Sequence, residues 1–441
     1  MSLSFEIRNF LKAKLRTGPR FRAMLSQFQA SGQLGGAQLA DWQWQHLQRT
    51  LASAYRNVPY YRQLFQQHGV HPDQLHSPAD LRQLPITEKS AIRADPAQFL
   101  HERHRGLKFR AQTSGSTGTP LTLSRDSHSV NAENAFLWRF WLSHGKQLDS
   151  RRATVRADLI ADVASQRLWV YNRFQRELLL SAFHLSDAAM GRMLDKLTAY
   201  QAYDLYAYPS TAYVLADYAA RSGRELQFGA VFTSSEQLFD YQRELVERQF
   251  ATHVRDWYGQ AERVAAIAHC RHGRYHVQED YSWVELLPVE NGEHEVIGTS
   301  FFNHLMPLIR YRTGDRVLLH DDACPCGSAF RSIKAIAGRT AAYLLTPDGR
   351  KVSLVNHIPR GVPHLIEVQF VQETPDALCL RVVAEAGFSA QDGAMLIQRA
   401  RERISTDMHY RIEQVPLIPR TAAGKFMPII ALPAAPSGGQ A

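Results

Sequence analysis

The sequence predicts an α/β protein with a large N-terminal domain and a small C-terminal α+β domain. Between about residues 100 and 300, short apolar runs such as LWVY, AVFTSS and THVRDWYG alternate with longer segments of helical periodicity. This alternation is typical of strands and helices that build one layered α/β unit. After Gly338 and Arg339 the pattern changes to several strands around one helix, which indicates a second, smaller unit.

The first part of the chain, about residues 1–95, is expected to be mainly helical. Residues 37–69 are rich in Leu, Gln and Arg, and Pro59 interrupts the helical period within NVPYYRQLF, because proline lacks a backbone N–H. Further helices are expected at 210–222 and 239–250. These elements all belong to the N-terminal domain, which we assign to residues 1–338.

The C-terminal domain is expected to span residues 339–432. It begins with a hairpin around TPDGRKV and continues with strands, a helix and a last strand before a loop. The strands are expected at about 364–371, 378–385 and 410–416, and the helix at about 389–406. The remaining segment PAAPSGGQA, residues 433–441, predicts a disordered tail.

Composition narrows the class of protein. The 441 residues are 45% hydrophobic and 21% charged, as in ordinary soluble globular proteins. The start MSLSFEIRNF lacks the apolar core of a signal peptide, and no apolar run reaches the length of a membrane span, so we expect a cytoplasmic protein.

The segment FEIRNFLKAKLRTGPRFRAML is basic and amphipathic. Membrane association is therefore expected to be peripheral at most, and docking of this helix on its own domain is the favoured alternative.

The charge of the chain bears on its partners. The formal net charge is +9, which admits an anionic partner. The basic residues are scattered and no known DNA- or RNA-binding motif occurs, so we expect no nucleic-acid partner. A positive field that attracts an anionic nucleotide is the favoured interpretation. With only four cysteines in the chain, a disulfide framework is not expected.

The stretch RAQTSGSTGTPLTL indicates a phosphate-binding loop. Gly115 and Gly118 can adopt backbone conformations in which consecutive N–H groups converge on one anion. Four hydroxyl side chains add donors to the same loop: Thr113, Ser114, Ser116 and Thr117. The Walker spacing GxxxxGK[ST] is absent and no lysine follows the second glycine, so the cation that accompanies a phosphate must come from elsewhere in the chain.

Three later motifs supply the remaining groups of a nucleotide site. In WYGQAER, Tyr258 could stack on a base and Glu262 could hold Mg²⁺. In IRYRTGDRV, Asp315 follows a tight turn at Gly314 and suits ribose hydroxyls. In IPRTAAGKF, Lys425 on a glycine-tipped loop provides the missing cation. Taken singly, these residues have simpler interpretations. Tyr258 would pack in the core, Asp315 would form a turn, and Lys425 would be a solvated surface charge.

The order and spacing of these motifs resemble those of the adenylate-forming superfamily, which includes acyl-CoA synthetases and peptide-synthetase adenylation domains. The series runs from TSGSTGTP through YGxxE, YRTGD and GR to PRTxxGK, over about residues 40–430. The segments NVPYYRQLF, LPITEKSAIR, AYPSTAYVLADY and MPLIRYRTGD followed by CPCGS are most similar to the phenylacetate-CoA ligase branch, especially its relatives from capsule and exopolysaccharide gene clusters. The resemblance implies a layered α/β adenylation domain with a small, mobile C-terminal lid.

The resemblance also implies a role for each site residue. The catalytic residues would be Lys425, Glu262 and Thr117. The loop from Thr113 to Gly118 would grip the β- and γ-phosphates of ATP. The rest of the nucleotide would be bound by Ser235, Glu236, Tyr258, Gly259, Asp315 and Arg339. Glu262 would bind Mg²⁺, and Lys425 would bridge the acyl carboxylate and the α-phosphate.

The implied reaction is ATP-dependent adenylation of a carboxylic acid to acyl-AMP and pyrophosphate, with transfer to coenzyme A or a carrier thiol expected next. Lys425 and Mg²⁺ would neutralise two anions that must approach each other. The sequence does not identify the acid, although its pocket is expected around residues 208–213 and 234–236. Two alternatives remain open: a nucleotidyl transferase that leaves AMP on its product, and a catalytically silent nucleotide-binding scaffold of a polysaccharide-assembly complex. A zinc-bearing nucleic-acid binder lacks a base-reading element.

Two positions depart from the pattern of the branch. The domain junction reads GRTAA, with Ala341 and Ala342 in place of two aspartates. The adenine-side turn reads SSE in place of SGE, which adds a Cβ at Ser235 and retains Glu236. The alanines predict a shifted balance between the two poses of the lid and a slower thiol-transfer step.

Three of the four cysteines indicate a metal site. Cys324 and Cys326 form a turn in CPCG, and Cys270 lies near several histidines. The candidate fourth ligands are His269, His272 and His276. We favour His276, because CRHGRYH allows a short turn to bring it to Cys270, and four such ligands suit a closed, structural zinc site. The alternative is three reduced, partly buried thiols, and Cys379 is assigned to the core.

Overall fold

A computed structural model describes most of the chain. The described residues are 7, 9–10, 13–14, 17–113, 121–156, 166–339, 344–352, 355, 358–421 and 424–432. Several predicted positions lie outside them, namely Ser114, Gly115, Ser116, Thr117, Gly118, Ala341, Ala342 and the tail 433–441. The backbone of Arg339 is described and its side chain is not.

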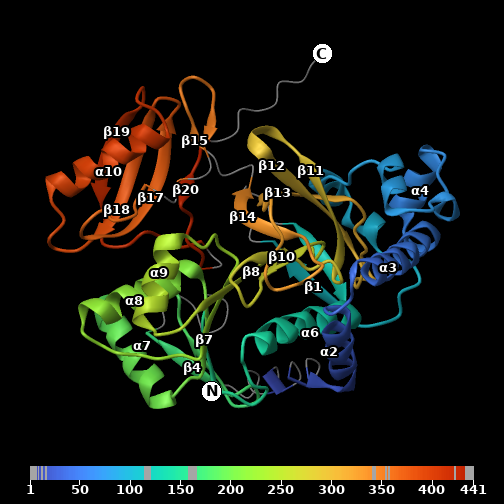
Figure 1. Cartoon of the computed structure of the whole chain (residues 1–441), viewed down its shortest axis with the longest axis horizontal. Helices are drawn as coiled ribbons and strands as arrows, with labels where there is room; N and C mark the ends of the chain where they lie inside the picture. The colour runs from blue at the N-terminus through green and yellow to red at the C-terminus, as the bar shows by residue number, and fades with distance from the viewer. Residues whose placement is uncertain are drawn as a thin grey trace.

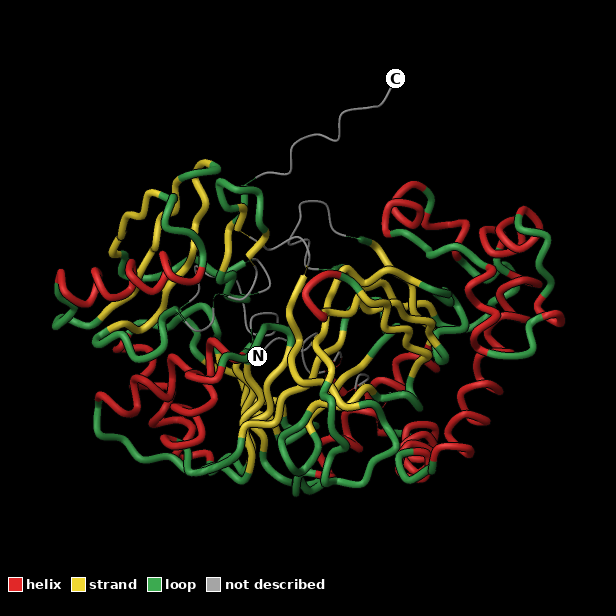
Figure 2. Tube along the Cα trace, turned by 45° about the horizontal axis from the view of Figure 1, so that its top comes forward, coloured by secondary structure: helices red, strands yellow, loops and turns green. Residues whose placement is uncertain are grey.

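Most strands of the described chain belong to one large mixed β-sheet (Figure 1, Figure 2). In spatial order these strands are β11 (Ser282–Pro288), β12 (Glu293–Ser300), β13 (Tyr311–Leu319), β14 (Ser332–Arg339), β10 (Tyr275–Val277), β9 (Ala266–His269), β8 (Val254–Gly259), β7 (Ala230–Ser234), β6 (Asp204–Ala207), β3 (Arg152–Val155), β5 (Glu177–Leu180) and β4 (Trp169–Asn172). A separate antiparallel hairpin, β1 (Lys108–Gln112) and β2 (Thr122–Asp126), carries the predicted phosphate loop between its strands.

One half of the large sheet is parallel, within the α/β part that the alternation of strands and helices predicted. Strands β5, β3, β6, β7 and β8 run parallel to one another, with β4 antiparallel at the edge. The connecting helices are α7 (Asp187–Tyr200), α8 (Pro209–Arg221) and α9 (Asp240–Gln249). Every residue of β5 and β7 is buried, which is typical of parallel strands covered on both faces.

The antiparallel half of the sheet packs against helices from the first part of the chain. These are α2 (Pro19–Ser31), α3 (Gly36–Asn57), α4 (Pro59–Gln67), α5 (Lys89–Ala94) and α6 (Ser127–Ser143), with the 3-10 turns η1 (Pro72–Gln74), η2 (Pro78–Gln83) and η3 (Pro96–Phe99). A further 3-10 turn, η4 (Glu290–Gly292), lies between β11 and β12. Pro59 occupies the first turn of α4, where its missing N–H is not required. The buried Tyr61 hydroxyl accepts a hydrogen bond from the Ile309 N–H at 2.9 Å. Within the described residues, no helix is long and apolar enough to cross a bilayer.

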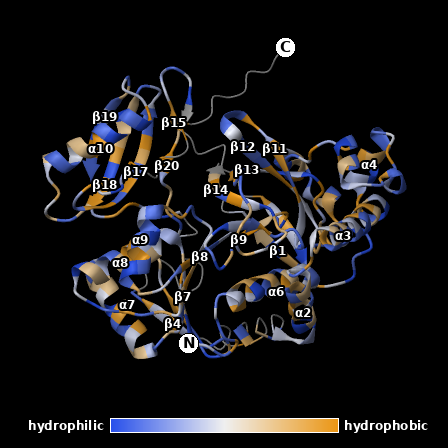
Figure 3. Ribbon diagram, viewed as in Figure 1, coloured by the Kyte–Doolittle hydropathy of each residue, from blue (hydrophilic) through white to orange (hydrophobic). Residues whose placement is uncertain are grey.

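Residues 344–432 form a second sheet with its own core, and we call this part the C-terminal module. Its strands, in spatial order, are β19 (His409–Gln414), β18 (Ala377–Ala384), β17 (Leu365–Thr374) and β20 (Ile429–Ile430), with the hairpin β15 (Leu344–Leu345) and β16 (Lys351–Val352) beside them. Helix α10 (Ala390–Arg403) packs Leu396 and Ala400 into the core. Figure 3 shows hydrophobic and hydrophilic residues on this helix, as expected of a helix with one buried face.

The C-terminal module lies against α8 and α9 of the large part (Figure 1). Ile366 packs on the core to which these helices contribute. The Arg360 guanidinium pairs with the Glu244 carboxylate on α9 at 2.6 Å. The Phe426 N–H donates to Oε1 of Glu236 at 2.5 Å. The predicted fold class, a large α/β part with a small α+β part, is confirmed.

Candidate active site

Several predicted nucleotide residues lie at the carboxyl ends of the parallel strands. β7 ends at Ser234 and is followed by Ser235 and Glu236, and β8 ends at Gly259. Ligands of open α/β sheets bind at this edge. Ser235 has a φ of +74°, a left-handed conformation that costs a residue with a Cβ roughly 1–2 kcal/mol. The structure therefore explains why glycine is the usual residue of this turn in the branch that the sequence resembles.

Gly259 has no space for a side chain. A Cβ at this position would lie 2.3 Å from Cζ3 of Trp257, far inside any normal contact distance. The Trp257 ring is buried and packs edge-to-face against Phe136, with 5.9 Å between ring centroids. Packing of a neighbouring ring is thus sufficient to require glycine at the end of β8.

Tyr258 and Asp315 contact each other although they come from distant strands. The Tyr258 hydroxyl donates to Oδ2 of Asp315 at 2.7 Å. Strands β9, β10 and β14 lie between β8 and β13 in the sheet, so the bond requires the sheet to curl until β8 and β13 approach each other. Asp315 also lies opposite Arg339 in the register of β13 and β14. The fold therefore brings the predicted adenine and ribose residues together.

Glu262 is buried, and among the described residues only one of its carboxylate oxygens has a hydrogen-bond partner. Oε1 accepts a hydrogen bond from the Tyr311 hydroxyl at 2.9 Å. Oε2 is buried and has no hydrogen-bond partner among the residues that the structure describes. A buried carboxylate oxygen without a donor is costly, and a hard divalent cation is a natural partner for it. The arrangement fits the predicted Mg²⁺ ligand.

Thr113 closes the base of the predicted phosphate loop. Its N–H donates to the Leu121 carbonyl at 3.0 Å, and its Oγ1 accepts the Leu121 N–H at 2.9 Å. These two bonds hold the ends of segment 114–120 together. Thr113 is buried, and its hydroxyl hydrogen is the group that it can still donate to a ligand.

Lys425 lies on a tight turn of the C-terminal module. The Thr421 N–H donates to the Lys425 carbonyl at 3.0 Å, and the Lys425 N–H donates to Oγ1 of Thr421 at 3.1 Å. Gly424 has a φ of +66°, which only glycine adopts freely. The next residue, Phe426, makes the hydrogen bond to Glu236. The lysine predicted to supply the missing cation is therefore one residue away from a contact with the adenine-side turn.

Glu236 binds two backbone N–H groups from different parts of the molecule. Its Oε1 accepts the Phe426 N–H, and its Oε2 accepts the Ser210 N–H at the start of α8 at 3.1 Å. Burial raises the pKa of Glu236, whereas its hydrogen bonds with Ser210 and Phe426 and the nearby Arg420 guanidinium oppose that shift. These contacts favour the ionised carboxylate.

Arg156 lies at the same sheet edge and was not identified from the sequence. Its guanidinium carbon lies 4.8 Å from the ring centroid of Tyr206 and 4.6 Å from that of Tyr208. It also donates to the hydroxyls of Ser234 and Ser235 at 3.2 and 2.9 Å. The available signal was an arginine directly after the apolar run of RATVR, which is too common a pattern to distinguish a site residue. The region expected to hold the acid thus contains a cation.

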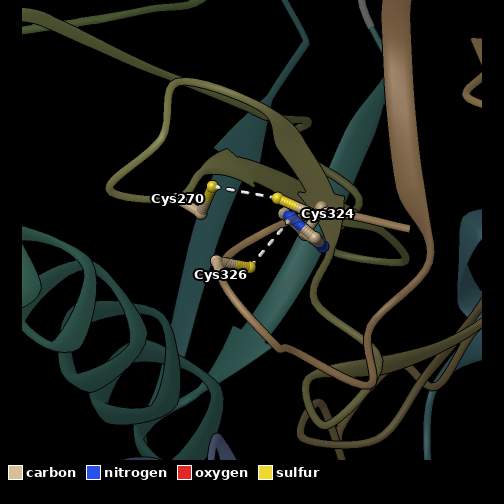
Figure 4. Close-up of side chains that lie close together, drawn as sticks. Cys270, Cys324 and Cys326 are labelled. Atoms are coloured by element: carbon tan, nitrogen blue, oxygen red, sulfur yellow. Dashed lines mark hydrogen bonds between the residues drawn. The ribbon is translucent and has the colours of Figure 1, made fainter. Parts of the chain in front are cut away.

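The predicted metal ligands converge at one point, as Figure 4 shows for the three cysteines. The ligand atoms of Cys270, His276, Cys324 and Cys326 all lie within 4.8 Å of one another. Cys270 Sγ is 3.7 Å from Cys324 Sγ, and Cys326 Sγ is 3.5 Å from His276 Nε2. Cys270 follows β9, His276 lies on β10, and the CPCG turn connects β13 to β14. The cluster therefore joins two hairpins of the curled sheet.

The histidine in this cluster is the one favoured from the sequence. Nδ1 of His276 hydrogen-bonds the Phe330 carbonyl at 2.8 Å, which fixes the tautomer and leaves Nε2 as a ligand. His269 is instead a buried residue of β9, and its Nδ1 accepts the Asp256 N–H at 3.1 Å. His272 is exposed and is not part of the cluster.

The described chain has the two-part architecture of adenylate-forming ligases of known structure. 2-Hydroxyisobutyryl-CoA ligase in its postadenylation state has the same fold: it is 18% identical, covers 91% of each chain and has a TM-score of 0.73. The same enzyme in its thioesterification state has a TM-score of 0.60 at 19% identity, again over 91% of each chain.

Sequence relatives indicate the branch within this class. Protein CapK of Staphylococcus aureus is 26% identical over 383 residues, which cover 84% of each chain. The phenylacetate-coenzyme A ligase of Pseudomonas putida is 25% identical over 330 residues, covering 70% of this chain and 72% of the relative. Residues 344–431 match the family model of the CapK C-terminal domain. The chain is thus similar to CapK and to phenylacetate-CoA ligases over most of its length, which confirms the resemblance seen in its motifs.

Proposed function

We propose that the protein activates a carboxylic acid with ATP, forming acyl-AMP and pyrophosphate, and then transfers the acyl group to the thiol of coenzyme A. The observation that carries this proposal is the pairing of Tyr258 with Asp315 and of Tyr311 with Glu262. These bonds draw the motif residues of β8 and β13 together and leave Oε2 of Glu262 without a partner among the described residues. The fold shared with acyl-CoA ligases supports the same reaction.

In this proposal ATP lies across the carboxyl edge of β7 and β8. Tyr258, Gly259 and the backbone of the turn at Ser235 and Glu236 face the adenine. Asp315, opposite Arg339 in the sheet register, accepts hydrogen bonds from the ribose hydroxyls. The loop that Thr113 closes, including Thr117, holds the β- and γ-phosphates.

The chemistry follows from the charges that must meet. The acid is already ionised, so it needs no general base, but its carboxylate must approach an anionic α-phosphate in line. Mg²⁺, held by Glu262, would neutralise the phosphate oxygens. Lys425 would bind the attacking carboxylate and the α-phosphate together, because the turn that carries it reaches the adenine-side turn through Phe426. Attack of the carboxylate oxygen on the α-phosphorus releases pyrophosphate.

The second half-reaction requires a thiol. Its sulfur attacks the acyl carbon of the acyl-AMP, and AMP leaves with the oxygen that bridged the two groups. Coenzyme A is the proposed acceptor because two of the proteins named above, phenylacetate-coenzyme A ligase and 2-hydroxyisobutyryl-CoA ligase, are coenzyme A ligases, and a carrier-protein thiol is the alternative acceptor. A place in capsule polysaccharide biosynthesis is supported by the likeness to CapK alone.

We also propose that Cys270, His276, Cys324 and Cys326 hold one structural zinc ion. Zn–S bonds of about 2.3 Å in a tetrahedral site place two sulfurs about 3.8 Å apart, and with a Zn–N bond of about 2.1 Å a sulfur and a nitrogen are about 3.6 Å apart. The observed separations are 3.7 and 3.5 Å. Four protein ligands leave no open position for a substrate, so the role is structural.

The proposed reaction is tested with a panel of carboxylic acids in ATP–pyrophosphate exchange. Exchange that depends on one acid and does not require coenzyme A is expected, followed by AMP and thioester release when coenzyme A is added. A product that keeps AMP and ignores thiols would identify a nucleotidyl transferase. ATP binding without exchange for any acid would support the scaffold and overturn the proposal.

A further inference from the structure

The contact between Glu236 and the Lys425 turn links the two parts of the molecule at a buried point. Phe426 is 8% exposed, and its N–H donates to Oε1 of Glu236 at 2.5 Å. A buried backbone N–H needs an acceptor, and the hydrogen bond to a carboxylate is of the stronger, charge-assisted kind. This bond therefore stabilises the observed pose relative to any pose in which the Lys425 turn moves away from Glu236.

The Glu236 side of this contact is fixed by helix α8. Its other carboxylate oxygen accepts the Ser210 N–H at 3.1 Å. Because α8 begins with Pro209, the Ser210 N–H is the first donor of the helix. A negative charge is stabilised at this end by the helix dipole. Glu236 is thus anchored on the rigid parallel half of the sheet when it receives Phe426.

The Phe426 side is fixed within the C-terminal module. The bonds between Thr421 and Lys425 close the turn before it. After it, Gln369 donates to the Met427 carbonyl at 2.8 Å, and the Phe370 N–H donates to the Pro428 carbonyl at 2.8 Å. The turn and the sheet of the module therefore move together, and the position of Phe426 reports the position of Lys425.

Two ion pairs at the surface between the parts are weaker restraints. Arg360 and Glu244 form an exposed pair at 2.6 Å, with half of each side chain in solvent. Arg221 and Glu385 approach to 3.9 Å and are also partly exposed. Exposed pairs of this kind contribute little to stability. Among the hydrogen bonds described between the parts, the one to Glu236 is the buried one.

We propose that Glu236 is a positioning residue that clamps the Lys425 turn in the adenylation pose. This inference rests on the proposed function, because it assigns Glu236 to the first half-reaction. Release of the Phe426 N–H frees the module to move and presents a thiol-binding face for the second half-reaction. Glu236 then acts on the chemistry through Lys425 and does not touch the reacting atoms.

The first test measures the clamp without any substrate. Hydrogen–deuterium exchange of the Phe426 amide is followed in the purified chain and in three variants: Glu236→Ala, Glu236→Gln and the control Glu244→Gln. Exchange should be roughly 10- to 100-fold faster in Glu236→Ala, because the amide loses its acceptor. Glu236→Gln keeps an oxygen acceptor of the same shape and should lie between, while Glu244→Gln should match the wild type. Unchanged exchange in Glu236→Ala would overturn the clamp.

The second test separates positioning from adenine binding. In ATP–pyrophosphate exchange, Glu236→Ala should lower kcat roughly 10- to 100-fold with a smaller effect on KM for ATP, because fewer molecules hold Lys425 in place. A raised KM with unchanged kcat would assign Glu236 to the adenine and overturn the clamp. If the wild-type chain activates no acid, the proposed function fails. Hydrogen–deuterium exchange of the Phe426 amide then tests by itself whether Glu236 holds the Lys425 turn in place. If Glu236→Ala does not fold, Glu236→Gln provides both measurements.

Discussion

Replacement of Lys425 by alanine tests the charge that the phosphate loop lacks. Lys425 is partly buried on its turn, so an effective dielectric constant of about 20 is appropriate. At about 4 Å from an anion, its charge then contributes about 4 kcal/mol. Part of that interaction already exists when substrates bind, so we expect a 10²- to 10³-fold lower adenylation rate, about 3–4 kcal/mol.

Lys425→Ala should lower the adenylation rate and leave ATP affinity nearly unchanged. Tyr258 and Asp315 lie on the large sheet and Glu262 lies in the turn after β8, and their contacts do not depend on the C-terminal module. ATP affinity, measured by calorimetry, should therefore change by less than about threefold, while pyrophosphate exchange falls. Arg403→Ala, which removes an exposed cation from the same module, is the control. Wild-type exchange in Lys425→Ala, or a loss of ATP affinity as large as the loss of rate, would refute the reasoning.

Three further predictions concern the metal cluster, the end of β8 and the response to acid. Protein purified without added metal should contain about one zinc per chain, and Cys324→Ser should lose it; less than about 0.2 zinc in a folded wild-type chain would dismiss the site. Gly259→Ala should lower the free energy of unfolding by about 1–3 kcal/mol through overpacking against Trp257, whereas Gly36→Ala, where a Cβ meets nothing within 4 Å, should not; equal denaturation midpoints would contradict this. Burial, reinforced by neighbouring Arg and His side chains, lowers the pKa of His46 to about 4. Between pH 6.5 and 4 the unfolded chain therefore binds a proton that the folded chain does not, so the free energy of unfolding should fall by up to about 3 kcal/mol as the pH drops. His46→Gln should flatten that dependence in denaturant titrations, and an unchanged slope would count against it.

The elements that follow from local chemistry were predictable from the sequence. Pro59 marks the boundary between α3 and α4 because proline fits the first turn of a helix, and β7 and β8 are apolar runs of the length of buried strands. The ligand set around Cys270 followed from short spacings, since a turn of a few residues limits where His276 can lie. Strand β20 was missed because its two residues carry no periodicity.

The contacts that depend on the curl of the sheet could not be predicted. Nothing near Tyr258 in the sequence indicates that its hydroxyl reaches Asp315, because three strands separate β8 from β13 in the sheet. The same holds for Arg156, whose importance arises only when β3, β6 and β7 align their carboxyl ends. The contact of Glu236 with Phe426 depends on the pose of the C-terminal module, which motif spacing does not encode.

The central claim is that the carboxylate of an acid attacks the α-phosphate of ATP. An acid identified by pyrophosphate exchange, labelled with ¹⁸O in its carboxylate, is converted with ATP and coenzyme A, and the products are examined by mass spectrometry. Because AMP leaves with the oxygen that bridged it to the acyl group, the account predicts one ¹⁸O in AMP and none in pyrophosphate. Unlabelled AMP, or label in inorganic phosphate formed alongside ADP, would contradict it.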